Sequence, residues 1–213
     1  MVQPGHVMNA EERLLGFDCR RGFERVAADW DAKRREEYLF RTEVVQPLST
    51  DTTVWPAVLA SDLRPGNCIG HQDLWSDLQC LQTCLHTPDL QPSAEAPLIA
   101  ITLHLSEKDK MESDFWKSAV PQTSPPVRNE TWPFVGYDVS DRWLLSGLSN
   151  CGFVPGKDDK EALRREWSDK LNQYHLYANL EHATQFRELS NRRVAEHCPF
   201  FVFGIWIIPS DSS

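Results

Sequence analysis

Basic residues are scarce over much of this sequence. No lysine occurs between Lys33 and Lys108, and residues 51–100 carry Arg64 as their only cation, against the acids Asp51, Asp62, Asp73, Asp77, Asp89 and Glu95. The whole chain of 213 residues has a formal net charge of −9. Nucleic-acid binding needs a basic surface that neutralises phosphates, so this composition argues against it. An acidic surface favours solubility or the capture of a basic protein.

Long apolar runs are also missing. The longest, FFVFGIWII at 200–208, is too short to cross a bilayer as a helix. The first residues, MVQPGHVMNAEERLLGF, have neither the basic start nor the apolar run of a signal peptide. We therefore expect a cytoplasmic protein that does not contact membranes. Its six cysteines are then expected to be reduced thiols.

Most motifs that carry chemistry are absent. The sequence has no Gly-x-Gly-x-x-Gly loop, no Walker pattern, no Gly-x-Ser-x-Gly elbow and no Cys-x-x-Cys or His-x-x-x-His pair. Cys80 and Cys84 lie one helical turn apart, but no further ligand follows at a spacing typical of a metal site. We therefore predict no metal and no cofactor.

The sequence does contain the pattern of a folded α+β or α/β domain. Apolar residues make up 41% of the chain, enough for a sizeable core. Periodicity predicts helices at about 18–37, 73–86, 157–178 and 180–196, and strands at 37–46, 53–60, 97–105, from about 132, and 200–208. This order indicates a mixed sheet with helices packed on it.

The domain is expected to be single, at 17–213, after a loose N-terminal lead at 1–16. The last strand, 200–208, is continuously apolar, which predicts a central position with both faces buried. Segment 53–60 contains Pro56 and is read as an edge strand, which could pair with a second copy in a homodimer.

Two groups of residues could still support catalysis. Cys151 stands between Asn150 and Gly152, and its base would be one of His175, His182 and His197. The second group is Asp138 and Asp141, which could act as an acid–base pair or cap the turn that follows. We favour packing for the cysteine and capping for the aspartates, and assign no catalytic residue. Trp132, Phe134 and Trp143 are predicted to be core anchors.

Three segments carry a family resemblance: VGYDVSD at 135–141, LLSGLSNCGF at 144–153 and PFFVFGIWII at 199–208. They resemble bacterial immunity proteins of polymorphic or type VI-secreted toxin systems, most of all the group partnered with restriction-endonuclease-like DNase toxins. The resemblance covers roughly residues 90–210. It implies a cytoplasmic, non-enzymatic antitoxin that binds its cognate toxin and occludes or distorts the toxin's active site.

We predict two partner-binding patches for such a toxin. The acidic patch consists of Asp62, Asp73, Trp75 and Asp77, and the loop patch of Glu107, Asp109, Glu112, Asp114 and Trp116. Carboxylates can imitate the phosphates that a basic nuclease holds, and aromatic residues are common anchors of interfaces. Two alternatives stay open: a small hydrolase that uses Cys151 or the Asp138/Asp141 pair, and a non-catalytic adaptor of a secretion or phage system.

Overall fold

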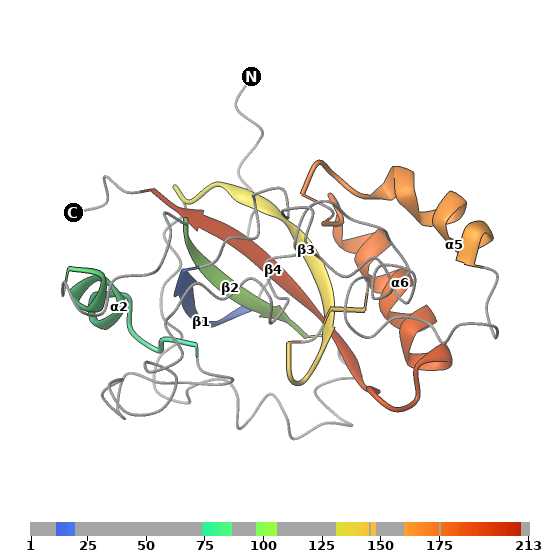
Figure 1. The fold of residues 1–213 in the computed structure, drawn as a ribbon, viewed down its shortest axis with the longest axis horizontal. Helices are drawn as coiled ribbons and strands as arrows, with labels where there is room; N and C mark the ends of the chain where they lie inside the picture. The colour runs from blue at the N-terminus through green and yellow to red at the C-terminus, as the bar shows by residue number, and fades with distance from the viewer. Residues whose placement is uncertain are drawn as a thin grey trace, which may run out of the picture.

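The computed structural model of the protein describes residues 12–19, 74–86, 97–105, 131–144, 146–147, 160–174 and 176–209. Their strands form one 4-stranded sheet in the order β1-β2-β4-β3, made of β1 (Glu12–Cys19), β2 (Leu98–His104), β3 (Phe134–Asp141) and β4 (Phe200–Ile208). Helices pack on this sheet, so the α+β class and the single domain are confirmed (Figure 1).

Every neighbouring pair of these strands is antiparallel. The predicted mixed sheet is therefore wrong for the described strands. Strand direction depends on which strands become neighbours, and periodicity within one segment carries no such information. β4 lies between β2 and β3, and nearly all of its residues are buried. Its predicted central position is confirmed. A strand that is covered on both faces has no side facing solvent, so all of its positions can be apolar.

β1 corrects the predicted N-terminal lead. Residues 12–16 belong to a strand that pairs with β2, so the boundary at residue 17 falls inside a structural element. The helix expected from Asp18 cannot begin there, because Asp18 and Cys19 end this strand. A bulge between Leu14 and Gly16 interrupts the alternation of side chains in β1, which hides the strand pattern in the sequence. The remainder of the predicted helix and segments 37–46 and 53–60 lie outside the described residues.

Helix α2 (Leu78–Leu85) begins later than the predicted 73–86. Its N-cap is Asp77, whose side chain accepts a hydrogen bond from the backbone N of Cys80 at 3.0 Å. Trp75 precedes the helix and exchanges backbone hydrogen bonds of 2.8 and 2.9 Å with Phe17 of β1. Pairing with the sheet edge therefore replaces the first turn of the expected helix, and the side chain of Asp77 starts the helix after it.

The predicted helix 157–178 is shorter than expected. Helix α5 (Lys160–Trp167) passes into a 3-10 turn, η5 (Ser168–Lys170), and Leu171 then forms a β-bridge with Tyr177. Asn172 Oδ1 accepts hydrogen bonds from the backbone of Tyr174 and Leu176. This side chain satisfies backbone groups that a helix would otherwise pair. The next helix, α6 (Leu180–Arg193), confirms most of the predicted 180–196.

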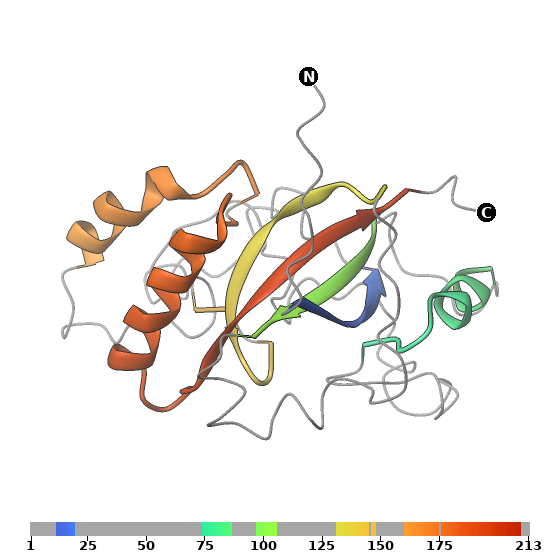
Figure 2. The same cartoon turned by 180° about the vertical axis from the view of Figure 1, so that it is seen from behind.

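The helices lie at the two ends of the sheet (Figures 1 and 2). Val202 and Trp206 of β4 meet them from one face, because residues an even number of positions apart on a strand share a face. The α6 cluster contains Tyr137, Val139, Leu163, Trp167, Tyr177, Ala183, Phe186, Val194, Phe200 and Val202. The α2 cluster contains Leu14, Phe17, Cys19, Trp75, Leu81, Cys84, Ala100, Trp132, Trp206 and Ile208. Each large apolar side chain fully buried in these clusters contributes about 2 kcal/mol to the free energy of unfolding.

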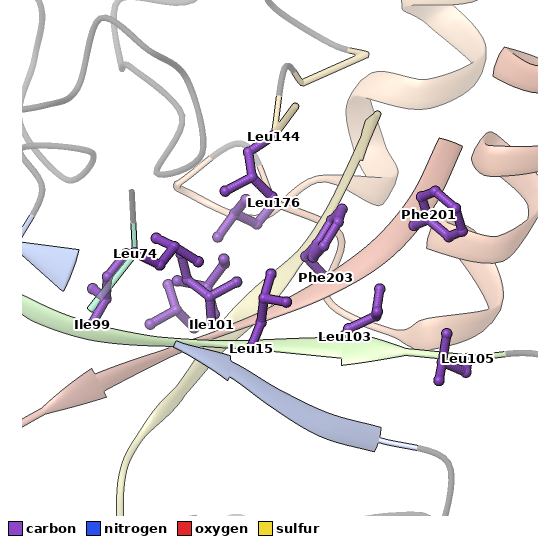
Figure 3. Close-up of a cluster of buried hydrophobic side chains, with 12 residues drawn as sticks. Leu15, Leu74, Ile99, Ile101, Leu103, Leu105, Leu144, Leu176, Phe201 and Phe203 are labelled. Atoms are coloured by element: carbon purple, nitrogen blue, oxygen red, sulfur yellow. The ribbon is translucent and has the colours of Figure 1, made fainter. Parts of the chain in front are cut away.

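The opposite face of the sheet holds a third set of buried side chains. This opposite-face cluster contains Leu15, Leu74, Ile99, Ile101, Leu103, Leu105, Val135, Leu144, Leu176, Phe201, Phe203 and Ile205. Figure 3 shows Leu103 and Phe203 projecting from the sheet on the side where Leu144 and Leu176 lie. Successive β4 residues therefore alternate between clusters, as expected for a strand with two buried faces.

Cys80 corrects the prediction of six reduced thiols. It is disulfide-bonded, and its partner lies outside the described residues. Cys19 and Cys84 are buried free thiols, and Cys198 is an exposed one. Burial, followed by the nearby charge of Asp18, raises the pKa of the Cys19 thiol to about 12. Because the thiolate is the reactive form, Cys19 is chemically inert near neutral pH.

Candidate functional site

The predicted partner-binding residues are only partly within the described segments. Asp62, Asp73 and the whole loop patch, with Glu107, Asp109, Glu112, Asp114 and Trp116, lie outside them. Trp75 lies inside, but only 1% of its surface is exposed, so it is a core residue and not an accessible anchor. Asp77 is exposed, and its carboxylate caps α2.

Asp138 lies in the interior of the sheet and not in an open site. Its Oδ1 accepts hydrogen bonds from the backbone N of Val139 at 2.8 Å and from Ser146 Oγ at 2.9 Å. Its Oδ2 has no hydrogen-bond partner. Burial raises the pKa of the Asp138 carboxyl from 3.8 to about 7, although these hydrogen bonds oppose the rise. At neutral pH the carboxyl is therefore partly protonated.

The hydrogen bond from Ser146 places Asp138 in a structural role. Ser146 also forms a β-bridge with Ser140, and the Gly147 backbone N donates to the Val139 carbonyl at 2.8 Å. Asp138 therefore fastens the segment 146–147 along the edge of β3. The predicted capping role is wrong for Asp138, because its carboxylate accepts from the side chain of Ser146 and not from the backbone of a turn or helix that follows.

Asp141 organises the turn at the end of β3. Its Oδ1 accepts from the Trp143 backbone N at 2.8 Å, and its backbone carbonyl accepts from Leu144 N at 3.1 Å. Its Oδ2 lies 2.9 Å from His197 Nδ1 in the connection between α6 and β4. The predicted turn-capping role is confirmed. Asp138 and Asp141 engage different groups, so the described structure does not assemble the two carboxylates into one acid–base pair.

Trp143 corrects the prediction that it anchors the core. Its side chain is 51% exposed, the only large hydrophobic residue exposed to this degree in the described segments. Leu144 adopts a φ of 62° and turns its side chain into the opposite-face cluster. The turn therefore buries Leu144 and leaves the tryptophan outside. The guanidinium of Arg142 stacks over the Trp143 ring at 4.6 Å from its centroid.

The other two predicted core anchors lie in the core or against it, since Trp132 is buried and Phe134 is partly buried against Tyr137 and Trp206.

The turn that carries Trp143 meets the end of α6. Asn191 Oδ1 accepts from the Phe200 backbone N at 2.7 Å, and Phe200 pairs with Asp141 across β3 and β4. The end of α6 therefore meets the Trp143 turn at one corner of the sheet. The exposed charged residues of 141–144 and 191–199 are Arg142, Arg192, Arg193 and Glu196. A spacing rule could not have found this corner, because its members lie some fifty residues apart in the sequence.

A second buried polar cluster lies on the helix-bearing face of the sheet. The Thr102 hydroxyl bonds to the Glu12 carboxylate, and Trp206 Nε1 donates to Thr102 Oγ1 at 3.1 Å. A Cβ at Gly204 would lie 2.5 Å from Thr102 Oγ1 and 2.7 Å from Glu12 Oε1. Only glycine leaves room for these polar side chains to close over the strand. The cluster is tightly packed and leaves no space at Gly204 for a ligand.

The described segments contain no group of three or more histidine, cysteine or acidic side chains that could hold a metal ion. Their helices are all too short or too polar to cross a membrane. Comparison with known proteins gives no matching family model, no matching curated protein and no matching solved structure. The resemblance to immunity proteins therefore stays a prediction, and the function below is argued from the chain itself.

Proposed function

We propose that this chain is an immunity protein, an antitoxin that binds and neutralises a cognate secreted toxin. The proposed toxin is a basic nuclease effector, most readily one delivered by a type VI secretion system. The observation that carries the proposal is the uneven charge of the chain, with six acids and a single arginine in residues 51–100. A nuclease must expose basic residues to hold DNA, and an acidic protein can occupy that surface in place of phosphates.

Asp77 supports the proposal within the described part of the acidic patch. It is exposed at the start of α2, where Gln79, Thr83 and His86 also face solvent. Because its carboxylate is already fixed by the cap of the helix, it would meet a partner with little loss of conformational freedom. Trp75 does not take part directly, and instead holds α2 against β1.

Co-expression with the product of a neighbouring gene tests the proposal. Cells should survive the toxin only when this chain is present, and the purified proteins should form a complex in a calorimetric titration. If the cells die equally with and without the chain, the antitoxin proposal is wrong. The complex should also weaken with added salt, because electrostatic contacts between exposed groups are screened.

Asp77→Asn separates the charge of Asp77 from its cap, because asparagine is as good an N-cap as aspartate. We expect toxin association to slow by a few-fold with unchanged thermal stability. Asp169→Asn is the matched control, since it removes another exposed carboxylate, from η5 and outside the acidic patch. Equal effects of the two variants would mean that net charge matters and the acidic patch does not.

The compartment also needs a direct test. Action on a nuclease in the cell that makes it requires a cytoplasmic protein, yet Cys80 is disulfide-bonded, and disulfides persist mainly in oxidising compartments. Alkylation of free thiols in intact cells, followed by mass spectrometry, reports the state of Cys80 where the protein works. A reduced Cys80 supports the cytoplasmic proposal, and an oxidised one opposes it.

The pair of Asp141 and His197 favours a second candidate, carboxylate-dependent hydrolysis. A carboxylate that bonds Nδ1 of a histidine leaves Nε2 free to act as a general base, and His197 is one-third exposed. His197→Gln would remove the base and keep the fold. Hydrolysis of a panel of activated esters by the wild type, lost in this variant, would support the candidate. Absence of any turnover would eliminate it.

A further inference from the structure

We propose that Asp138 is a proton-operated latch, whose buried carboxyl holds the segment 146–147 on the edge of β3 while it carries a proton and frees this segment when the proton leaves. The ligand of the site is the proton. The response is the opening of one short segment while the sheet stays folded. This latch does not depend on the antitoxin role.

Asp138 lies among apolar side chains. It pairs with Phe203 across β3 and β4, and Ser140, two residues further on the same face, pairs with Phe201. Cross-strand partners share a face, so Asp138 belongs to the side of the sheet where both phenylalanines join the opposite-face cluster. Asp138 and Ser140 are both 0% exposed. An ionised carboxylate here has lost its hydration, which is costly as long as the segment 146–147 stays in place.

Few donors reach this carboxyl. Its Oδ1 accepts from the Val139 backbone N at 2.8 Å and from Ser146 Oγ at 2.9 Å, whereas its Oδ2 has no hydrogen-bond partner. The Ser140 hydroxyl lies near enough to lower the pKa of Asp138, yet it makes no hydrogen bond in this geometry. A hydroxyl can donate or accept, so Ser140 suits both forms of the carboxyl. Because Oδ1 already accepts two hydrogen bonds, Oδ2 is the oxygen that carries the proton.

No basic group of the described segments contacts Asp138 and offsets its charge. The segment 146–147 has no titratable side chain, and β4 presents phenylalanines to this face. The titratable group that senses Asp138 is the Tyr177 hydroxyl, whose pKa is raised by burial and then by the charge of Asp138. The nearest basic groups of the connection to β4 and of α6 contact other acids, His197 with Asp141 and Arg187 with Glu188.

Proton linkage sets the direction of the response. Burial raises the pKa of Asp138 to about 7, although the hydrogen bonds to this carboxyl oppose the rise. Ser146 Oγ contacts the carboxyl, so withdrawal of the segment 146–147 admits water and returns the pKa towards its ordinary value of 3.8. The closed form therefore holds the proton more tightly than the open form. A rise in pH towards 7 favours opening, and acidification favours closure.

Hydrogen exchange of the Gly147 backbone N–H tests the latch, because this group donates to the Val139 carbonyl at 2.8 Å only when the segment is in place. Its protection factor, measured by NMR on the full chain, should fall by up to about 100-fold between pH 5 and pH 8. Low concentrations of urea should leave this exchange unchanged, since a local opening exposes little surface. A constant protection factor, or a response to urea as steep as that of global unfolding, would overturn the proposal.

Asp138→Asn mimics the protonated carboxyl at every pH, because its amide keeps an acceptor oxygen and cannot ionise. The Gly147 protection factor should then stay at its low-pH value throughout. Asp141→Asn is the matched control on the same strand, and it alters the contact with His197, a residue type that changes charge near neutral pH. This control should retain the fall. The latch is disproved if Asp138→Asn retains the fall or if Asp141→Asn abolishes it.

A second measurement needs no variant. The side-chain carboxyl carbon of Asp138, followed by NMR in the wild-type chain, should titrate with a midpoint near pH 7. The fall in the Gly147 protection factor should level off above that midpoint, because the closed form then has no proton left to lose. A midpoint near the ordinary value of an aspartate would show that the folded chain does not hold this proton, and would end the proposal.

Discussion

Asp138 and Asp141 stand three residues apart on β3 and have opposite surroundings. Asp138 is fully buried, has one oxygen without a hydrogen-bond partner, and has its pKa raised to about 7. Asp141 is equally buried, but it meets His197 and the backbone of its own turn. The same type of side chain therefore holds one segment through a hydrogen bond from a serine and another through its contact with a histidine. The contrast teaches that burial depth alone does not set the structural role of a carboxylate, because the partners it meets matter as much.

The pH dependence of stability is the largest effect we expect from this contrast. The folded pKa of Asp138 lies above its unfolded value, so the folded state holds the proton more tightly. Its contribution is fully present below about pH 4 and is lost as pH rises through about 7, roughly 4 kcal/mol in all. Urea unfolding at a series of pH values measures this loss. Asp138→Asn should flatten the curve over that range, and an unchanged slope would mean that Asp138 titrates normally.

Removal of the hydroxyl that Asp138 binds should have the next largest effect. Ser146→Ala leaves a buried carboxylate oxygen with one donor fewer, which should cost about 2 kcal/mol of unfolding free energy. Ser190→Ala is the matched control, because its buried hydroxyl has no hydrogen-bond partner and its loss should cost under about 0.5 kcal/mol. Denaturant titration of both variants measures the two losses of unfolding free energy. Equal losses would show that the bond to Asp138 does not stabilise the segment 146–147.

Removing the contact between His197 and Asp141 should lower the free energy of unfolding by a smaller amount. His197→Ala removes a partner whose side chain is one-third exposed, so we expect a loss of about 0.5 to 1 kcal/mol. High salt should reduce the difference from the wild type, since partly exposed charges are screened. Thermal unfolding with and without added salt measures this. A loss above about 2 kcal/mol would indicate that the pair is more deeply shielded than its exposure suggests.

Trp143→Ala should lower the free energy of unfolding by under about 0.5 kcal/mol, because its side chain is 51% exposed and belongs to none of the three buried clusters. Trp132→Ala, in the α2 cluster, should by contrast cost about 3 to 5 kcal/mol. Circular dichroism melts of the two variants compare them directly. Similar losses would place Trp143 in the core after all.

The sequence was most informative where one segment carries its own pattern. The continuous apolar run at 200–208 predicted a buried central strand, and β4 is one. The periodicity of residues 180–196 predicted α6 to within a few residues of its end. The sequence was misleading where pairing with a residue far along the chain decides the backbone conformation. Trp75 left the expected helix to pair with Phe17 of β1, and Tyr177 left another to pair with Tyr137 of β3. In both places a strand edge supplied hydrogen bonds that no local window could include.

The candidate site could be predicted only in part for the same reason. Asp141 was expected to cap a turn, and it does, because a cap depends on the next few residues. Its partner His197 lies 56 residues away and could be named as a candidate base but not paired. The exposed Trp143 was missed altogether. Trp143 and Leu144 are adjacent apolar residues, and the turn geometry alone decides which of them is buried.

The sequence by itself determined the acidity of this chain, the apolar central strand and the presence of helices, because composition and periodicity are properties of neighbouring residues. The tertiary structure alone decided the protonation of Asp138, the pairing of Asp141 with His197 and the exposure of Trp143. Each of these depends on which residues the fold brings together and how much water it leaves between them. Burial and electrostatic interaction act through space, and the order of residues along the chain does not encode them locally.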